Sequence, residues 1–117
     1  MKAILLGDAM IGGEGFKKAW EKYLGNYGAK LVVNDWEKDW GKLQYRRLEV
    51  EKRGPEIETV DETILKEGKD AQALMGLFVP VSSKVMDAMP NLRLVGVSRA
   101  GLENVNVDEA TKRGILV

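Results

Sequence analysis

The sequence predicts an α/β domain with a doubly wound, mostly parallel sheet of five strands and helices on both faces. Short apolar runs alternate along the chain with longer segments in which apolar residues recur at helical spacing. Asp61 and Ser82 stand where helices are expected to begin, and Gly or Pro follows most of the predicted elements. Strands and helices that alternate in this order are joined by right-handed crossovers, which makes the sheet parallel.

The predicted elements cover most of the chain. Strands are expected at residues 2–7, 29–35, 71–79, 92–98 and 115–117, with a further short strand at 57–60. Helices are expected at residues 14–28, 35–54, 61–70, 82–89 and 106–114. Five main strands in 117 residues suit a flavodoxin-like fold, and we treat residues 1–117 as one domain. Ligands of such sheets bind at the carboxyl ends of the strands, here the loops that follow Gly7, Asp35, Val79 and Ser98.

Composition excludes several classes of function. Lys plus Arg and Asp plus Glu number 18 each, so the chain lacks the basic excess of a nucleic-acid-binding protein. It has no cysteine, which rules out disulfides and a thiolate nucleophile, and no histidine, the commonest general base. Its longest apolar stretch, residues 73–81, is too short to span a bilayer. We therefore expect a cytoplasmic protein with neither nucleic acid nor membrane as a partner.

A glycine-rich loop follows the first predicted strand at residues 7–16. Such loops can present backbone N–H groups to a phosphate at a helix N-terminus. Asp35 ends the second predicted strand, where a dinucleotide site places its ribose-binding acid. The glycine spacing fits neither the P-loop nor the dinucleotide fingerprint, and Glu14 would oppose a phosphate. We favour a loop that serves turn and cap geometry over a nucleotide site.

Trp36 and Trp40 are one helical turn apart in the predicted helix 35–54. We expect them on a helix face that packs against the sheet. The alternative is an interface patch, since Trp is enriched in binding hot spots.

A turn of Ser98, Arg99, Ala100 and Gly101 follows the fourth main predicted strand. It offers consecutive backbone N–H groups, a guanidinium and a glycine without side-chain hindrance, which together suit a carboxylate. An equally weighted alternative is a purely structural turn. In that case Gly101 would adopt a positive φ, and Arg99 would pair with Glu103, Asp108 or Glu109.

Residues 70–117 resemble the D-isomer-specific 2-hydroxyacid dehydrogenases, the family that includes phosphoglycerate dehydrogenase. In this family an apolar strand leads through a Pro-Val turn and a helix to a second strand, a Gly-bearing loop and a short helix. The corresponding residues here stand in the same order: Pro80-Val81, Pro90-Asn91-Leu92, Gly96, Gly101, Glu103-Asn104-Val105 and Arg113-Gly114-Ile115. Residues 1–69 fit only as a divergent first half.

The resemblance implies that this is the substrate (catalytic-side) domain. It places the substrate carboxylate on backbone amides of residues 98–101 and a border of the substrate site at Leu77, Phe78 and Val79. Many members have an Arg-Ser pair where this chain has Gly76-Leu77, which argues against a phosphorylated substrate. Many also have a second glycine where this chain has Arg99. Asn106 replaces the aspartate that ends the Glu-Asn-Val step.

The resemblance also implies an NAD- or NADP-dependent parent enzyme whose separate dinucleotide-binding domain supplies the cofactor site and the catalytic Arg, Glu and His. That domain is absent here, so we expect no cofactor site in this chain and no activity from it alone. Its partner would be a small 2-hydroxy or 2-keto acid, and exposed cleft surface at residues 77–80, 102 and 115–117 favours a homo-oligomer. The alternative is a stand-alone flavodoxin-like module for ligand sensing or protein interaction.

Overall fold

The computed structural model describes all residues from Met1 to Val117. Its four strands, β1 (Lys2–Asp8), β2 (Lys30–Glu37), β3 (Ala73–Gly76) and β4 (Leu94–Val97), form one sheet in the order β2-β1-β3-β4. All three strand pairs are parallel, as predicted. The five α-helices are α1 (Gly13–Leu24), α2 (Trp40–Arg53), α3 (Glu62–Glu67), α4 (Ser83–Ala88) and α5 (Val107–Lys112). Short 3-10 helices occupy Gly25–Tyr27, Pro55–Ile57 and Gly68–Asp70.

The predicted count of five strands is wrong. Residues 115–117 make a single parallel bridge, between Leu116 and Leu94 on the outer edge of β4. Leu116 donates its N–H to the Arg93 carbonyl at 2.9 Å and accepts from the Val95 N–H at 2.8 Å. The short strand expected at 57–60 is also absent, because the chain there leaves a 3-10 helix for irregular backbone outside the sheet.

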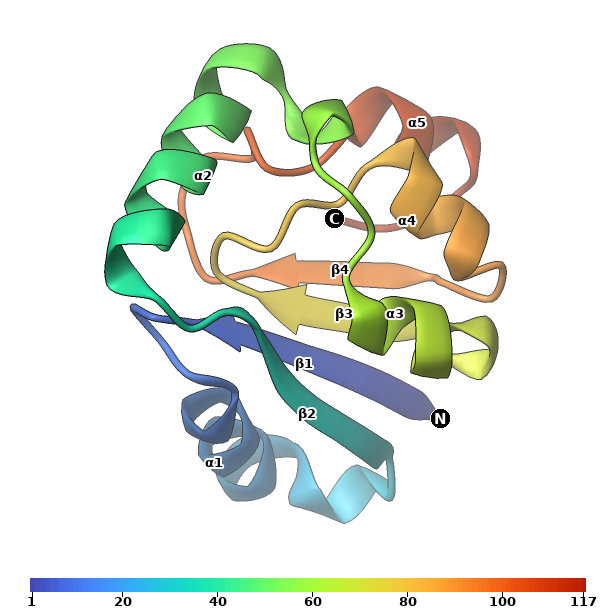
Figure 1. Cartoon of the computed structure of the whole chain (residues 1–117). Helices are drawn as coiled ribbons and strands as arrows, with labels where there is room; N and C mark the ends of the chain where they lie inside the picture. Colours follow the sequence, from blue (N-terminus) through green and yellow to red (C-terminus); the bar gives the residue numbers. More distant parts are fainter.

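The alternation of side chains along β1 gives the sheet two apolar faces. Ile4 and Leu6 belong to the larger core, which α2, α3, α4 and α5 cover. Ala3 and Leu5 belong to a smaller cluster with Trp20 of α1. Helices therefore lie on both faces of the sheet, as predicted, but α1 alone covers one of them (Figure 1).

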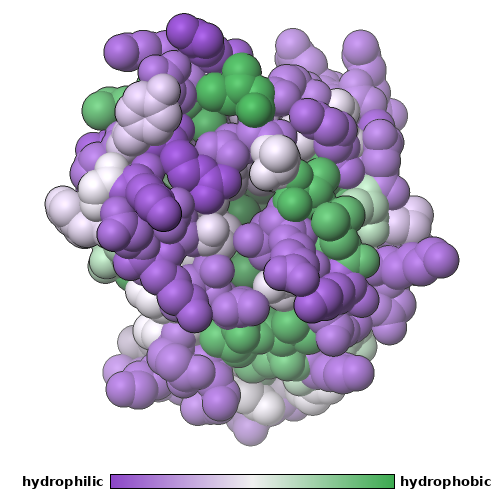
Figure 2. Space-filling view, in the orientation of Figure 1, coloured by the Kyte–Doolittle hydropathy of each residue, from purple (hydrophilic) through white to green (hydrophobic).

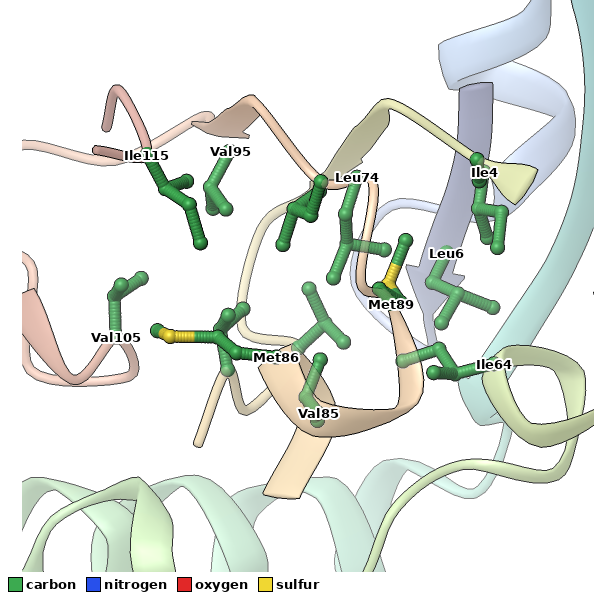
Figure 3. Close-up of a cluster of buried hydrophobic side chains, with 14 of the residues drawn as sticks. Ile4, Leu6, Ile64, Leu74, Val85, Met86, Met89, Val95, Val105 and Ile115 are labelled. Atoms are coloured by element: carbon green, nitrogen blue, oxygen red, sulfur yellow. The ribbon is translucent and has the colours of Figure 1, made fainter. Parts of the chain in front are cut away.

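Methionine and branched aliphatic side chains fill the larger core (Figure 3). Val85, Met86 and Met89, from α4 and the residue after it, are each 1% exposed, and Figure 3 shows them within this cluster. Ser82 begins α4 as predicted, its hydroxyl accepting the Val85 N–H at 3.3 Å. Asp61 caps α3 in the same way, accepting the Thr63 N–H at 2.9 Å.

None of the helices is both long enough and apolar enough to cross a membrane.

Candidate functional site at the carboxyl edge of the sheet

The loops that follow β3 and β4 lie side by side, as the sequence predicts for neighbouring parallel strands. Ser98 donates its N–H to the Gly76 carbonyl at 2.9 Å. The guanidinium of Arg99 lies 5.0 Å from the ring centre of Phe78. The structure thus brings together the two segments of the predicted substrate site, residues 77–79 and 98–101.

The side chains of the first loop are mostly turned inward. Leu77 is 6% and Val79 1% exposed, whereas Phe78 is half-buried. Pro80 is buried as well, so the expectation that residues 77–80 form an exposed cleft surface is wrong for all but Phe78. The same expectation is wrong for Ile115, which is 8% exposed and belongs to the larger core. Leu77 and Val79 complete the core beneath the loop, and this leaves Phe78 as the side chain that can border a ligand.

The second loop exposes unpaired backbone donors. Among the intramolecular hydrogen bonds none is donated by the N–H groups of Arg99, Ala100 or Gly101, while that of Ser98 is used. Ser98 and Ala100 are exposed, and Arg99 and Gly101 are half-buried. Three successive free N–H groups at the end of a strand suit an anion such as a carboxylate.

Gly101 leaves no room for a side chain in the observed arrangement of this loop. Its φ is not positive, so the predicted alternative of a left-handed glycine turn is wrong. A Cβ atom at this position would instead collide with the carboxylate of Glu103. A glycine here leaves that carboxylate free to pair with Arg99.

The guanidinium of Arg99 is not free. Nη2 lies 3.0 Å from Oε2 of Glu103 and 3.2 Å from Oε1 of Glu51, and only 16% of the side chain is exposed. The predicted pairing with Glu103 is therefore confirmed, and Glu51 of α2 is a second partner that the sequence did not indicate. Figure 1 shows α2 on the side of the sheet toward which the arrowheads of β3 and β4 point.

Asn104 is a residue of this site that sequence reasoning did not single out. It is 1% exposed, and its Nδ2 donates to the Val79 carbonyl at 2.8 Å. Its backbone carbonyl accepts the Val81 N–H at 2.7 Å, next to a parallel bridge between Val81 and Val105. Asn104 thereby holds the loop after β3. The sequence feature that could have indicated this role is the side-chain amide in the middle of the Glu103-Asn104-Val105 motif, because an amide can bind backbone carbonyl groups.

Carboxylates of the protein itself accept three N–H groups of the glycine-rich loop after β1. Asp35 accepts the Gly13 N–H at 2.7 Å, at the start of α1. Asp8 accepts the N–H groups of Met10 at 2.8 Å and Ile11 at 3.1 Å. Since a carboxylate of the protein occupies the place a phosphate would take, the loop serves the turn and cap geometry that we favoured.

The two tryptophans do not share a helix face, which corrects the prediction made for them. Strand β2 continues to Glu37, so Trp36 lies on the sheet, 7% exposed, with the guanidinium of Arg46 4.5 Å from its ring centre. Trp40 is the first residue of α2 and is 56% exposed.

The structure contains no group of three or more carboxylate, His or Cys side chains that could hold a metal ion. Five open cavities of about 170 to 400 Å³ lie elsewhere and are not lined by residues 77–79 or 98–101. The candidate site is thus a pair of adjacent loops at the carboxyl edge of the sheet, with backbone N–H groups that no atom of the chain accepts.

The chain belongs to the D-isomer specific 2-hydroxyacid dehydrogenase family, because residues 31–117 match the model of that family's catalytic domain. Among curated proteins it is similar to a glyoxylate reductase of Thermococcus kodakarensis, with 41% identity over 71 residues, 60% of this chain and 21% of the relative. It is also similar to a glyoxylate reductase of Pyrococcus horikoshii, with 36% identity over 77 residues, 65% of this chain and 23% of the relative. The chain thus spans about a fifth of the length of these relatives.

Two solved structures share the fold. A cofactor (NAD+)-bound 3-phosphoglycerate dehydrogenase of Entamoeba histolytica matches with a TM-score of 0.63 and 15% identity over 99% of this chain and 32% of that one. The TT0316 protein of Thermus thermophilus matches with a TM-score of 0.61 and 18% identity over 99% of this chain and 29% of that one.

Proposed function

We propose that this chain is the substrate-binding domain of an NAD- or NADP-dependent 2-hydroxyacid dehydrogenase. Its loop at residues 98–101 binds the carboxylate of a small 2-hydroxy or 2-keto acid. The observation that carries the proposal is the run of unpaired N–H groups that begins with Arg99, Ala100 and Gly101, in a domain of this family. The position supports it, because ligands of parallel sheets bind at the carboxyl ends of the strands.

The role of this domain is to bind and orient the acid. Backbone N–H groups hold the carboxylate in one direction, and the half-buried ring of Phe78 borders the carbon chain. The nicotinamide cofactor, bound by another part of the enzyme, supplies the hydride chemistry. With no histidine or cysteine, this chain offers neither the commonest general base nor a thiolate, and we expect it to be inactive alone.

The substrate is proposed to be a small monocarboxylic acid. The loop after β3 presents Phe78 rather than a cationic side chain, and Arg99 is already paired with two carboxylates. No free cation is therefore provided for a phosphate or a second carboxylate. The names of the glyoxylate reductase relatives agree with a small monocarboxylic acid.

NMR titration of the ¹⁵N-labelled chain with glycolate tests the proposal. The amide signals of residues 99–101 should shift first, with a dissociation constant on the order of millimolar, or about 4 kcal/mol, because the site is open to water. Methyl glycolate, which lacks the carboxylate charge, serves as the matched control and should leave these signals in place. Shifts confined to residues 8–15, or equal shifts with the ester, would overturn the assignment.

A further inference from the structure

Helix α2 contacts both loops of the candidate site through two residues one turn apart. The guanidinium of Arg47 lies 4.9 Å from the ring centre of Phe78, on which Arg99 also packs at 5.0 Å. Glu51 lies 3.5 Å from Arg47 and 3.2 Å from Arg99. Glu51 thus pairs with both Arg47 and Arg99, the two arginines that pack on Phe78.

The ion pairs of Glu51 and Arg99 connect four charged side chains whose charges add up to zero. Arg47 and Arg99 are the two cations, and Glu51 and Glu103 are the two carboxylates. The side chain of Glu51 is 31% exposed and that of Glu103 is 51% exposed. Glu51 is thus the more sheltered partner of Arg99. It comes from a separate helix, whereas Glu103 lies in the same loop as the guanidinium it binds.

We propose that Glu51 determines the charge of the acid that the site accepts, by occupying the guanidinium of Arg99. The inference rests on the proposed function of residues 98–101. A guanidinium next to a carboxylate-binding loop is a natural receptor for a second anionic group, because it can form charge-assisted hydrogen bonds with a carboxylate or phosphate. While Glu51 and Glu103 both hold Arg99, a dianionic acid gains no such bond and meets two carboxylates instead. Removing the charge of Glu51, the more sheltered of the two, leaves Glu103 as the only carboxylate that competes for this guanidinium.

Separate NMR titrations with two 2-hydroxy acids of different charge measure this selectivity. Glycolate is a monoanionic 2-hydroxy acid, and tartronate adds one carboxylate to it. The ratio of their dissociation constants is read from the amide shifts of residues 99–101. If Glu51 had a purely structural role, replacing it would weaken the binding of both acids equally and leave the ratio of their dissociation constants unchanged.

The substitution Glu51→Gln keeps the size of the side chain and removes its charge. We expect it to shift the ratio about fivefold toward tartronate, the effect of roughly 1 kcal/mol for a partly exposed ion pair. In Glu51→Gln/Arg99→Met the shift should disappear, since the receptor is gone. Glu49→Gln is the matched control, because Glu49 lies on the same helix but pairs with the exposed Arg53 at 3.2 Å.

The proposal is overturned if Glu51→Gln leaves the ratio unchanged, or if the shift persists without Arg99. Failure of the proposed function looks different, because neither acid would then move the amides of residues 99–101 in the unmodified chain. In that case the response of Glu51→Gln to tartronate still decides the matter. An Arg99-dependent response supports the role of Glu51, and its absence overturns it. Urea unfolding of each variant verifies that the fold is retained.

Discussion

Asn106 donates a hydrogen bond from Nδ2 to the carboxylate of Glu56, at 3.0 Å. The same carboxylate accepts the N–H of Ser83 at 2.7 Å and its hydroxyl, and so joins the segment after α2 to the start of α4. Through the Oδ1 of the same amide, Asn106 accepts the Glu109 N–H at 3.1 Å and caps α5. The amide at this position therefore has a structural reason, since an aspartate could cap α5 but could not donate to Glu56.

Replacing Asn106 by Asp should destabilise the domain at neutral pH. The substitution retains the cap but sets two carboxylates against each other, and we expect a loss of about 1 kcal/mol in the free energy of unfolding. Urea denaturation at pH 7 measures it. Adding Glu56→Gln should restore much of the loss, because the glutamine amide can donate to the new carboxylate. An equal loss in the single and double variants would contradict this pairing.

Stability should fall in acid partly through Glu56. Burial by itself raises the pKa of this carboxyl, but hydrogen bonds from Ser83 and Asn106 outweigh it and hold the pKa below the ordinary value of 4.5. The unfolded chain therefore takes up the proton at higher pH than the folded chain. The stabilisation is present above pH 4.5 and is lost as the pH falls through the folded-state pKa.

Urea unfolding of the unmodified chain and of Glu56→Gln at about pH 6 and pH 3.5 tests this dependence. The variant should lose less stability between the two conditions, because its side chain does not titrate. Asp70 and Glu62 contribute in both proteins, since hydrogen bonds from Lys2 and Lys66 lower their pKa values. An identical loss in both proteins would show that Glu56 contributes nothing to the acid sensitivity.

Gly101→Val should damage carboxylate binding more than Arg99→Lys. The valine side chain enters the space of the Glu103 carboxylate and blocks the approach to the free N–H groups. Because 51% of the Glu103 side chain is exposed, that carboxylate can move away and the fold should survive. We expect at least a tenfold loss of glycolate affinity for the valine variant, or about 1.4 kcal/mol, by NMR titration. A larger loss for Arg99→Lys would mean that the guanidinium, rather than the backbone, binds the acid.

The chain should not bind NAD tightly. Gly13 already donates to Asp35, and this carboxylate would repel a pyrophosphate at the start of α1. Isothermal calorimetry with NAD at submillimolar concentration should give no saturable heat. Stoichiometric micromolar binding would contradict the assignment of residues 7–16 as a structural turn.

The domain should self-associate through apolar side chains near its C-terminal end. Leu102, Val107, Leu116 and Val117 are between 37% and 71% exposed and line a common open groove. Apolar patches interrupt the hydrophilic surface seen in Figure 2. Sedimentation should show concentration-dependent association that Leu116→Lys weakens, with Leu65→Lys, another exposed leucine, as the control. A monomer at all concentrations would contradict this expectation.

Local patterns in the sequence determined the main architecture. The apolar runs of β1, β3 and β4 and the helical spacing between them predicted parallel strands joined by helices, and their carboxyl ends predicted which loops would meet. These features depend on the period and order of the residues, which are properties of neighbours along the chain. The caps of α3 and α4 by Asp61 and Ser82 belong to the same class, because a cap binds N–H groups two or three residues away.

Only the tertiary structure decided where the strands end and what the site residues touch. Strand β3 stops at Gly76 although the apolar run continues to Val79, because Asn104 binds the chain beyond it. Trp36 belongs to β2 because β1 pairs with that segment as far as Glu37. Arg99 binds Glu51 across 48 positions of the sequence. Such long-range hydrogen bonds and ion pairs form between residues that no local pattern relates, so the fold alone brings them within reach.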